Sequence, residues 1–439
     1  MVNIQGLNQP PPPPPAQPGT GPSGTQGPQT QPVAPGLPPR VPGQTAFIEA
    51  RFFVPPPLNE TKLRSNEAVL HVGAGVSRDV IEATIARLGF SILDFEPLGS
   101  FGTNIIRLNT NNVSVRDAIL ALARERIAAA ATANFVYTLT QDPAARTTEN
   151  PEGDAAQYIL GKLRLSDIHR AIKGTNIPIA VIDSQIDTSH PDLEGVFSGQ
   201  FDATGSDEPP HAHGTGMAGA IASHRKLLGI APGAHLLAIR AFSSKATSAE
   251  STTFNILKGI EYAINNGVRI VNMSFAGPRD PTLERALKVA HSKGIVLIAA
   301  AGNAGPKSPP LYPAADPNVI AVTATDVDDK LFTGANRGRH VAIAAPGVDI
   351  LVAAPESAYQ LTTGTSVATA HISGIVALLL ERNPKLTPDD IRKILTASAK
   401  RLGPNNEFGA GLVDPAKALR LAEPKSADLT TGTPARAAR

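Results

Sequence analysis

Cysteine is absent from the 439 residues of this chain. Its absence excludes disulfide bonds, thiolate metal sites and a cysteine nucleophile. It does not fix the compartment, because disulfide-free proteins occur on both sides of a membrane. Long apolar runs are absent too. Runs such as residues 295–301 fall well short of the roughly 18 residues of a membrane-spanning helix, so we expect no membrane span.

A strong charge of either sign is also missing. The formal net charge is +2 and 42% of the residues are hydrophobic, a balance without the basic signature of nucleic-acid binding. The first residues, "MVNIQGLNQPPPPPPAQPG", contain no basic segment followed by an apolar core. We therefore expect no nucleic-acid partner, and no signal peptide is predicted at this start.

The chain is too long for one ordinary core, and its composition divides it into two folded parts with tails. Residues 1–45, rich in Pro, Gly, Gln and Thr, are predicted to be a disordered arm. For this arm a plain spacer is favoured over a docking site for a proline-reading domain. Residues 142–157 are predicted to be an exposed linker, and residues 423–439 a disordered tail.

Residues 46–141 show strand and helix patterns in the order β-α-β-β-α-β. The segments "EAVLHVGAG", "FSILDFEPLG", "TNIIRLNT" and "ANFVYTLT" are typical of strands. The segments "SRDVIEATIARLG" and "SVRDAILALARER" are typical of helices that begin after a serine N-cap. This order predicts a small α+β open-faced sandwich.

Residues 158–422 alternate apolar strands with helical stretches. Strands are predicted at "IPIAVID", "HLLAIRAF", "VRIVNMSF", "VIAVTATD", "VAIAAPG" and residues 294–302. The alternation indicates a doubly wound α/β domain with a largely parallel sheet and helices on both faces. Sites in such sheets form at the carboxyl ends of the strands, and "IPIAVID" ends there on an acid, Asp183.

Four side chains of this domain have complementary chemistry. A serine nucleophile needs a base within hydrogen-bond reach, an acid that orients the base, and fixed donors for the developing oxyanion. Ser366 begins a helix that is apolar nearly all round, His213 begins a glycine-rich helix in "HAHGTGMAGAIASH", and Asn303 ends a strand. With Asp183 they supply one group of each kind. Each alone has an ordinary structural reading, as a cap, a turn former or a helix start, so it is the set that indicates nucleophilic catalysis.

The same residues carry a family resemblance. "IDSQID", "HGTGMAG", "AGNAGP" and "GTSVATAHISG" resemble, in chain order, the motifs around the acid, base, oxyanion asparagine and nucleophile of the subtilisin-like serine peptidases, or subtilases. The first match is imperfect and the other three are close. Further segments between 158 and 422, such as "LLGIAPGAHLLAIRAF" and "FGAGLVDPAKAL", are similar to family segments, and the sandwich resembles the family's inhibitory propeptide.

The resemblance implies a serine endopeptidase that hydrolyses polypeptides through an acyl-enzyme. Asp183 would orient His213, His213 would take the proton from Ser366, and Asn303 would donate to the oxyanion. The propeptide-like domain would block the peptidase domain as an intramolecular inhibitor until cleavage within 140–157, in a monomeric zymogen that processes itself. The implied substrate-binding residues are Ser274, Phe275, Ala276, Gly277, Ala301 and Gly302.

The chain departs from the family pattern near the site. Where the family commonly has Gly, Gly, His and Pro, it carries Gln185, Ala212, Gly216 and Ala370. None of these changes removes a catalytic atom, and Gln185 is the one that would strain the turn after Asp183.

Calcium is a family cofactor, commonly held by a loop after the base helix. Here that span, "ASHRKLLGIAP", is short and lacks Asn and Asp. Asp187 and Asp192 could serve elsewhere, but we expect no metal and no other cofactor.

Two further functions stay open from the sequence. Gln185 could distort the turn so that the fold survives as a catalytically silent binding module, or the same chemistry could act as a serine esterase. The resemblance implies an exported enzyme, secreted or periplasmic, whereas the missing signal leaves an intracellular location open.

Overall fold

The computed structural model describes residues 51–140, 146–148, 157–244 and 249–424. The predicted arm at 1–45, most of the linker at 142–157 and nearly all of the tail at 423–439 lie outside the described residues.

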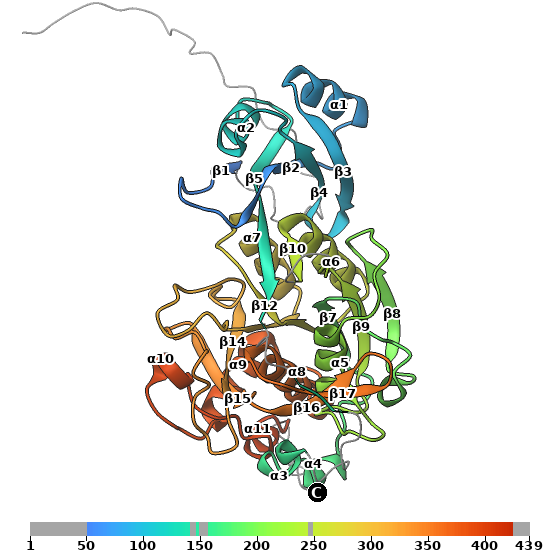
Figure 1. Cartoon of the computed structure of the whole chain (residues 1–439), viewed down its shortest axis with the longest axis vertical. Helices are drawn as coiled ribbons and strands as arrows, with labels where there is room; N and C mark the ends of the chain where they lie inside the picture. Colours follow the sequence, from blue (N-terminus) through green and yellow to red (C-terminus); the bar gives the residue numbers. More distant parts are fainter. Residues whose placement is uncertain (1–50, 141–145, 149–156, 245–248, 425–439) are drawn as a thin grey trace, which may run out of the picture. The chain divides into compact units, whose positions relative to one another are not determined.

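The first folded part is an α+β sandwich (Figure 1). Its sheet has the order β1-β5-β2-β4-β3, and only the β1–β5 pair is parallel. From β2 to β5 the elements follow the predicted β-α-β-β-α-β order. Strand β1 is not predicted, because its three residues precede three prolines and carry too short a pattern. The elements are β1 (Phe52–Val54), β2 (Leu63–Gly73), α1 (Arg78–Arg87), β3 (Ser91–Leu98), β4 (Thr103–Asn109), α2 (Val115–Leu122) and β5 (Ala128–Leu139).

Strand β5 is longer than predicted and belongs to both parts of the molecule. It begins at Ala128 rather than at 133, because its alanine-rich start pairs with β1 on one side and β2 on the other. Tertiary pairing here overrides the helix preference of alanine. Its other end pairs antiparallel with β10 (Glu250–Thr252) and β12 (Phe275–Ala276) of the second part.

The second part is built on a seven-stranded sheet whose neighbouring strands are all parallel. The strand order is β15-β14-β13-β11-β7-β9-β8. Strand β7 lies inside this sheet and ends on Asp183. The doubly wound α/β class is therefore confirmed. The strands are β7 (Pro178–Asp183), β8 (Phe197–Asp202), β9 (His235–Arg240), β11 (Ile270–Met273), β13 (Val296–Ala300), β14 (Val319–Thr325) and β15 (Val341–Pro346).

Helices cover both faces of this sheet. Side chains alternate along β7, so that Ile179 and Val181 pack in a core with α5 (Ala212–Ala222) and α8 (Thr365–Arg382). Ala180 and Ile182 pack in another with α6 (Thr253–Asn265) and α7 (Pro281–Ser292). The remaining helices are α3 (Tyr158–Lys162), α4 (Leu165–His169), α9 (Pro388–Ser398), α10 (Asn405–Phe408) and α11 (Pro415–Leu421).

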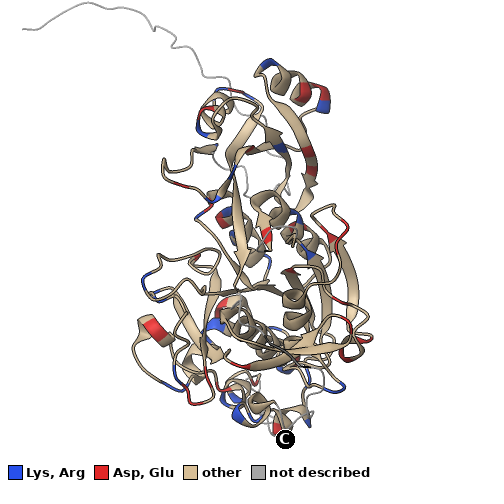
Figure 2. Ribbon diagram, viewed as in Figure 1, with Lys and Arg blue, Asp and Glu red and all other residues tan. Residues whose placement is uncertain are grey.

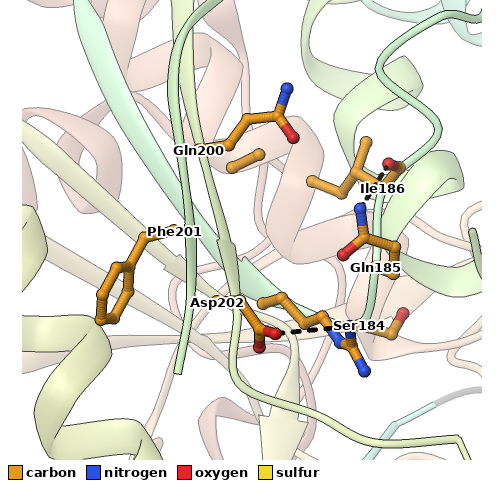
Figure 3. A pocket seen from close by; sticks show the side chains of 8 residues that line it. Ser184, Gln185, Ile186, Gln200, Phe201 and Asp202 are labelled. Carbon is orange, nitrogen blue, oxygen red and sulfur yellow. Dashed lines mark hydrogen bonds and ion pairs between the residues drawn. The ribbon is translucent and has the colours of Figure 1, made fainter. Parts of the chain in front are cut away.

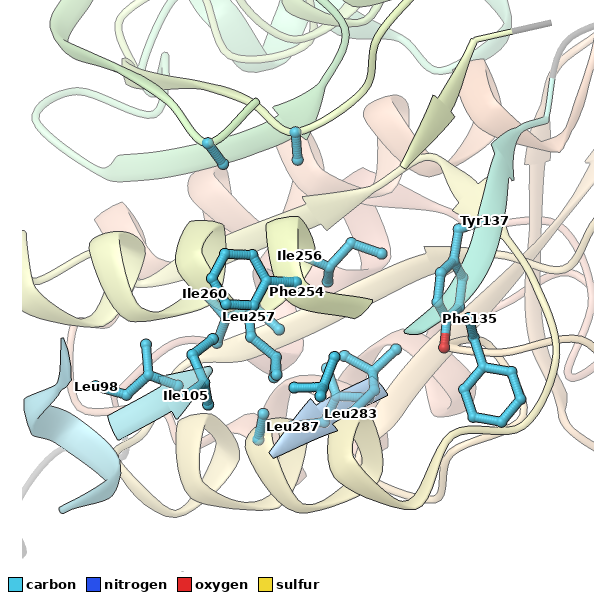
Figure 4. Packing of buried hydrophobic residues seen from close by; sticks show 14 of the residues in the cluster. Leu98, Ile105, Phe135, Tyr137, Phe254, Ile256, Leu257, Ile260, Leu283 and Leu287 are labelled. Atoms are coloured by element: carbon cyan, nitrogen blue, oxygen red, sulfur yellow. The ribbon is translucent and has the colours of Figure 1, made fainter. Parts of the chain in front are cut away.

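The core on the α6 and α7 side continues into the sandwich (Figure 4). Leu98 and Ile105 of the sandwich belong to the same buried cluster as Phe254, Leu257 and Leu283 of the two helices. All five side chains are almost completely buried. The two folded parts therefore share one apolar core, which stabilises their association by removing this surface from water.

A separate antiparallel sheet has the order β16-β17-β6, formed by β16 (Ile350–Ala354), β17 (Ala358–Thr362) and β6 (Arg146–Thr148). Helix α5 packs closely on β16. A Cβ at Gly216 would lie 2.9 Å from Val352 Cγ2, and one at Gly219 would lie 2.9 Å from Ala353 Cβ. Glycine in this helix is explained by the close approach of the sheet.

None of the helices in the described part of the chain combines the length and the hydrophobicity that a membrane crossing requires. Basic and acidic residues are interspersed along the ribbon of both folded parts (Figure 2).

Candidate active site

Asp183, His213 and Ser366 converge in the structure. His213 Nδ1 lies 2.7 Å from Asp183 Oδ1, and His213 Nε2 lies 3.0 Å from Ser366 Oγ. All three residues are at most 2% exposed. A histidine held by a carboxylate at one ring nitrogen presents the other to a hydroxyl, which is the arrangement that activates a serine.

Three elements bring these side chains together. Asp183 ends β7, His213 lies in the first turn of α5, and Ser366 lies in the first turn of α8. Gly214 permits the approach of α5 to β7, since a Cβ there would lie 2.6 Å from Ser184 O. Gly364, the N-cap of α8, has a φ of 155°, and a Cβ there would lie 2.7 Å from Asn303 Nδ2. The glycines of both motifs therefore create the room in which the four side chains meet.

Ser184 and His211 support Asp183, and the sequence analysis does not predict them. The Ser184 backbone N–H and hydroxyl both donate to Asp183 Oδ1, at 2.7 and 3.1 Å. The same hydroxyl accepts from the Gly214 N–H and lies 3.1 Å from His211 Nδ1. Burial and the nearby His213 lower the pKa of His211, so neutral His211 is favoured. A hydroxyl after the acid is a weak sequence signal, because turns use serine for many purposes.

Thr140, the residue after β5, occupies the site. Its carbonyl oxygen accepts from Asn303 Nδ2 at 2.9 Å and from the Ser366 hydroxyl. Its backbone N–H donates to Ser274 O at 3.3 Å, and its own hydroxyl Oγ1 lies 2.5 Å from Ser366 Oγ. Asn303 is fixed in turn, because its Oδ1 accepts from the Thr365 N–H and hydroxyl. The chain itself therefore places a peptide carbonyl between Asn303 and Ser366.

The residues before Thr140 lie extended between two strands. Phe275 pairs with Leu139 and Ala276 with Thr138 on one side, while Thr252 pairs with Val136 on the other. The Tyr137 side chain is fully buried, packs edge-on against Phe275 at 6.0 Å between ring centroids, and covers Gly277, where a Cβ would lie 2.3 Å from Tyr137 Cδ1. Of the predicted substrate-binding residues, Ser274, Phe275, Ala276 and Gly277 thus contact this segment.

Ala301 and Gly302 follow β13 beside the site. Their backbone N–H groups donate to Val322 O and Thr365 Oγ1 respectively, rather than to β5. Their role in a primary pocket stays a prediction.

Gln185 has ordinary backbone geometry, since it is not among the described non-glycine residues with positive φ. Its carbonyl accepts from the His211 N–H at 2.8 Å. Its half-buried side chain lines a cavity of about 220 Å³ with Gln200 and Arg240 (Figure 3). Gln185 therefore lacks the glycine-like backbone angle that would strain this turn, so the expected reason for a distorted site is not found here.

The two carboxylates named for calcium are occupied by protein donors. Asp192 accepts from the Lys226 and Leu227 N–H groups, at 2.8 and 2.9 Å. Asp187 accepts from the Ser189 N–H and hydroxyl and from the Glu356 N–H. A calcium ion needs six to eight oxygen ligands, and the described residues contain no group of three or more His, Asp or Glu placed to hold a metal. Asp187 and Asp192 therefore do not fit a calcium site.

Known proteins resemble this chain over the segment that contains these site residues. The model of the subtilase family of peptidases matches residues 174–411, more than half of the chain. The chain belongs to the subtilase family. This subtilase is accordingly a serine-type endopeptidase, a hydrolase. It is 35% identical to subtilisin E of Bacillus subtilis over 304 residues, which cover 65% of this chain and 79% of that enzyme. It is 37% identical to subtilisin BL of Lederbergia lenta over 258 residues, which cover 57% of this chain and 94% of that enzyme.

Among solved structures, the subtilase is similar to fervidolysin from Fervidobacterium pennivorans, described as a keratinolytic enzyme related to subtilisin. The TM-score is 0.70 at 22% identity, over 84% of this chain and 63% of fervidolysin. At this identity the likeness shows the fold alone.

Proposed function

We propose that this subtilase hydrolyses peptide bonds with Asp183, His213 and Ser366 as its catalytic triad and Asn303 as its oxyanion donor. We further propose that its first substrate is its own bond between Thr140 and Gln141. One observation carries both proposals: the Thr140 carbonyl accepts from Asn303 Nδ2 and lies beside the Ser366 hydroxyl, which is itself within reach of His213. A peptide carbonyl held in this way has the position that the carbonyl of a scissile bond would take.

The proposed mechanism uses only groups of this chain. His213, oriented through Nδ1 by Asp183, accepts the Ser366 proton at Nε2 while Ser366 Oγ bonds to the Thr140 carbonyl carbon. Asn303 Nδ2 stabilises the negative charge that develops on the carbonyl oxygen. His213 then gives the proton to the leaving Gln141 amine, and water enters by the reverse steps to release the acyl group. No step requires a metal.

We propose that the chain is a zymogen in which the sandwich is a tethered inhibitor. Two features support this: the end of β5 pairs with β10 and β12 and leads to Thr140 at Ser366, and the sandwich shares an apolar core with α6 and α7. The likeness to fervidolysin covers 84% of this chain, which is more than residues 158–439 alone could supply. The matched fold therefore includes residues before 158.

The substrates are extended polypeptides with an aromatic side chain four residues before the cut. The support is the burial of Tyr137 against Phe275 and Gly277, together with the backbone pairing of β5 on two sides. We further propose that the mature enzyme is monomeric and acts outside the cytoplasm, since it shares its family with the subtilisins.

Mass spectrometry of the purified wild type and of Ser366→Ala tests the proposal. We expect the wild type to yield a chain that begins at Gln141 and to be labelled on Ser366 by a fluorophosphonate. We expect Ser366→Ala to stay intact and unlabelled. Ser398→Ala is the matched control, because Ser398 is a buried serine whose hydroxyl bonds only within its own helix in the described contacts; it should cleave like wild type. An intact, unlabelled wild type would leave only the silent binding module.

A further inference from the structure

Strand β6, which follows the proposed cut in the sequence, pairs with one edge of β17. Residues Tyr359, Gln360 and Leu361 pair antiparallel with Thr148, Thr147 and Arg146 of β6. On its other edge β17 pairs with β16. Without β6, this edge of β17 would expose unpaired N–H and C=O groups, which are a ready template for another strand.

The polarity of this pairing fits a chain that leaves the site after the cut bond. Strand β17 ends at Thr362, shortly before Ser366, so Leu361 is the paired residue nearest the nucleophile in sequence. Its partner Arg146 is likewise the residue of β6 nearest Thr140. The chain therefore runs away from Ser366 along β17, as the portion of a substrate that follows the scissile bond must do.

The edge is held firmly against the helix that bears His213. The Gln360 side chain donates from Nε2 to Ala212 O at 3.1 Å, at the start of α5. His190 Nε2 lies 3.1 Å from Ala358 O, and its ring meets the Tyr359 ring edge-on at 5.4 Å. The Gln360 bond thus joins β17 to the start of α5, and His190 holds the other end of β17 to the segment that follows β7. A preformed edge binds a strand without paying for its own ordering.

We propose that the β17 edge, defined by Tyr359, Gln360 and Leu361, is a binding site for the sixth to eighth residues after the scissile bond of extended polypeptide substrates. This inference rests on the proposed function, because the sixth to eighth residues are counted from a cut after Thr140. The edge adds a third stretch of backbone pairing to the two that hold β5. Binding by backbone hydrogen bonds is tolerant of sequence and requires an extended segment. The enzyme should therefore favour long unfolded chains over short peptides.

The pairing itself is tested first in the uncut chain, which needs no activity. Because the protein has no cysteine, a disulfide can be built without background in Ser366→Ala. We expect at least one of the opposed pairs Arg146→Cys with Leu361→Cys, Thr147→Cys with Gln360→Cys, or Thr148→Cys with Tyr359→Cys to oxidise readily. The control, Thr147→Cys with Ala358→Cys, is out of register and should not. Failure of all three opposed pairs would overturn the proposal.

Substrate binding is then measured with the matured enzyme on peptides of its own sequence. A peptide of residues 137–150 should have a kcat/KM several-fold higher, on the order of 5–10-fold, than one of residues 137–144. In an antiparallel pair, alternate amides face the partner. Only one set of amides, either those of residues 146 and 148 or that of residue 147, can therefore bond to β17. N-methylation of the bonded set should remove this gain, whereas N-methylation of the other set should keep it. The enzyme's own residues 146–148 compete for the β17 edge with the longer peptide only, because the peptide of residues 137–144 does not reach it. The peptides are therefore compared on matured enzyme from which the segment before residue 157 has been removed.

The outcomes separate the two proposals. If the short peptide is cleaved but length and methylation have no effect, the β17 site is wrong and the proposed function stands. A length effect that both methylation sets leave intact would also overturn the β17 site. If no peptide is cleaved, the proposed function fails and the β17 site falls with it.

Discussion

The sandwich meets the peptidase part through two contacts that differ in kind. At α6 and α7, a sheet packs on helices through a shared apolar core, with polar bonds such as that from the Ser100 N–H to Glu261 Oε1 at 2.9 Å. At the active site, the single strand β5 lies between β10 and β12, and the residue that follows it, Thr140, contacts Ser366. The first contact contains no atom of the proposed chemistry, whereas the second is the proposed substrate. Cutting the chain and releasing the sandwich are therefore expected to be separate events, and substitutions should separate them.

Asn303→Ala should give the largest effect and should act on the cut alone. Asn303 Nδ2 donates to the Thr140 carbonyl at 2.9 Å, and loss of one oxyanion donor usually lowers turnover about 10²–10³-fold. A time course of chain cleavage by mass spectrometry measures the effect. Asn318→Ala, whose side chain bonds to Asp316 away from the site, is the control. Cleavage of Asn303→Ala at the wild-type rate would remove Asn303 from the mechanism.

Tyr137→Ala should weaken the hold of the cut sandwich. Tyr137 is fully buried against Phe275 and Gly277, and truncation of such a side chain to alanine costs about 3–5 kcal/mol. We therefore expect activity on added peptide to appear at least about 100-fold sooner after cleavage. Tyr137→Phe should be released far more slowly than Tyr137→Ala, because it keeps the buried ring and loses only the hydroxyl, which bonds to Pro278 O at 3.4 Å and to the Asp280 carboxylate. Equal release by Tyr137→Ala and wild type would mean that the sheet–helix contact alone retains the sandwich.

Asp280, which lies where α6 and α7 begin, makes the stability of the folded chain depend on pH. It is the N-cap of α7 and accepts from Thr253 Oγ1 and the Thr282 N–H. Burial raises its pKa to about 6, above the roughly 3.9 of an unfolded aspartate. The folded state therefore holds this proton more tightly. The stability it contributes is fully present below about pH 4 and is lost as pH rises through about 6.

Asp280→Asn should remove this dependence while keeping a good N-cap. We compare Asp280→Asn with its parent, the uncut Ser366→Ala chain. The free energy of unfolding of Asp280→Asn minus that of the parent should increase by up to about 3 kcal/mol as the pH rises from 4 to 7. Urea unfolding at pH 4, 5.5 and 7 measures the difference. A difference that is constant across these pH values would show that Asp280 does not titrate in this range.

The sequence predicts six of the seven strands of the peptidase sheet because each of the six is a local apolar run. The edge strand β8, "FSGQFD", is missed because its half-buried residues alternate with exposed ones. The convergence of Asp183, His213 and Ser366 also agrees with expectation, since carboxyl ends of parallel strands and helix starts meet at one edge. What the sequence misses depends on distant contacts. Thr140 acquires its place only because β5 pairs with strands more than 100 residues away. The alanine-rich start of β5 is a strand only because two neighbours pair with it.

The Thr140 side chain offers the smallest and most local test of how cutting is controlled. Its hydroxyl lies 2.5 Å from Ser366 Oγ and also bonds to Ser274 O, so it competes with His213 for the Ser366 proton. Thr140→Val keeps the branched shape and removes this competitor. Since one hydrogen bond contributes about 1 kcal/mol, self-cleavage should become about five-fold faster, measured by stopped time courses of refolding protein. Thr138→Val, two residues earlier and within β5, should leave the rate unchanged. Slower cleavage by Thr140→Val would show that the threonine hydroxyl assists the serine rather than restrains it.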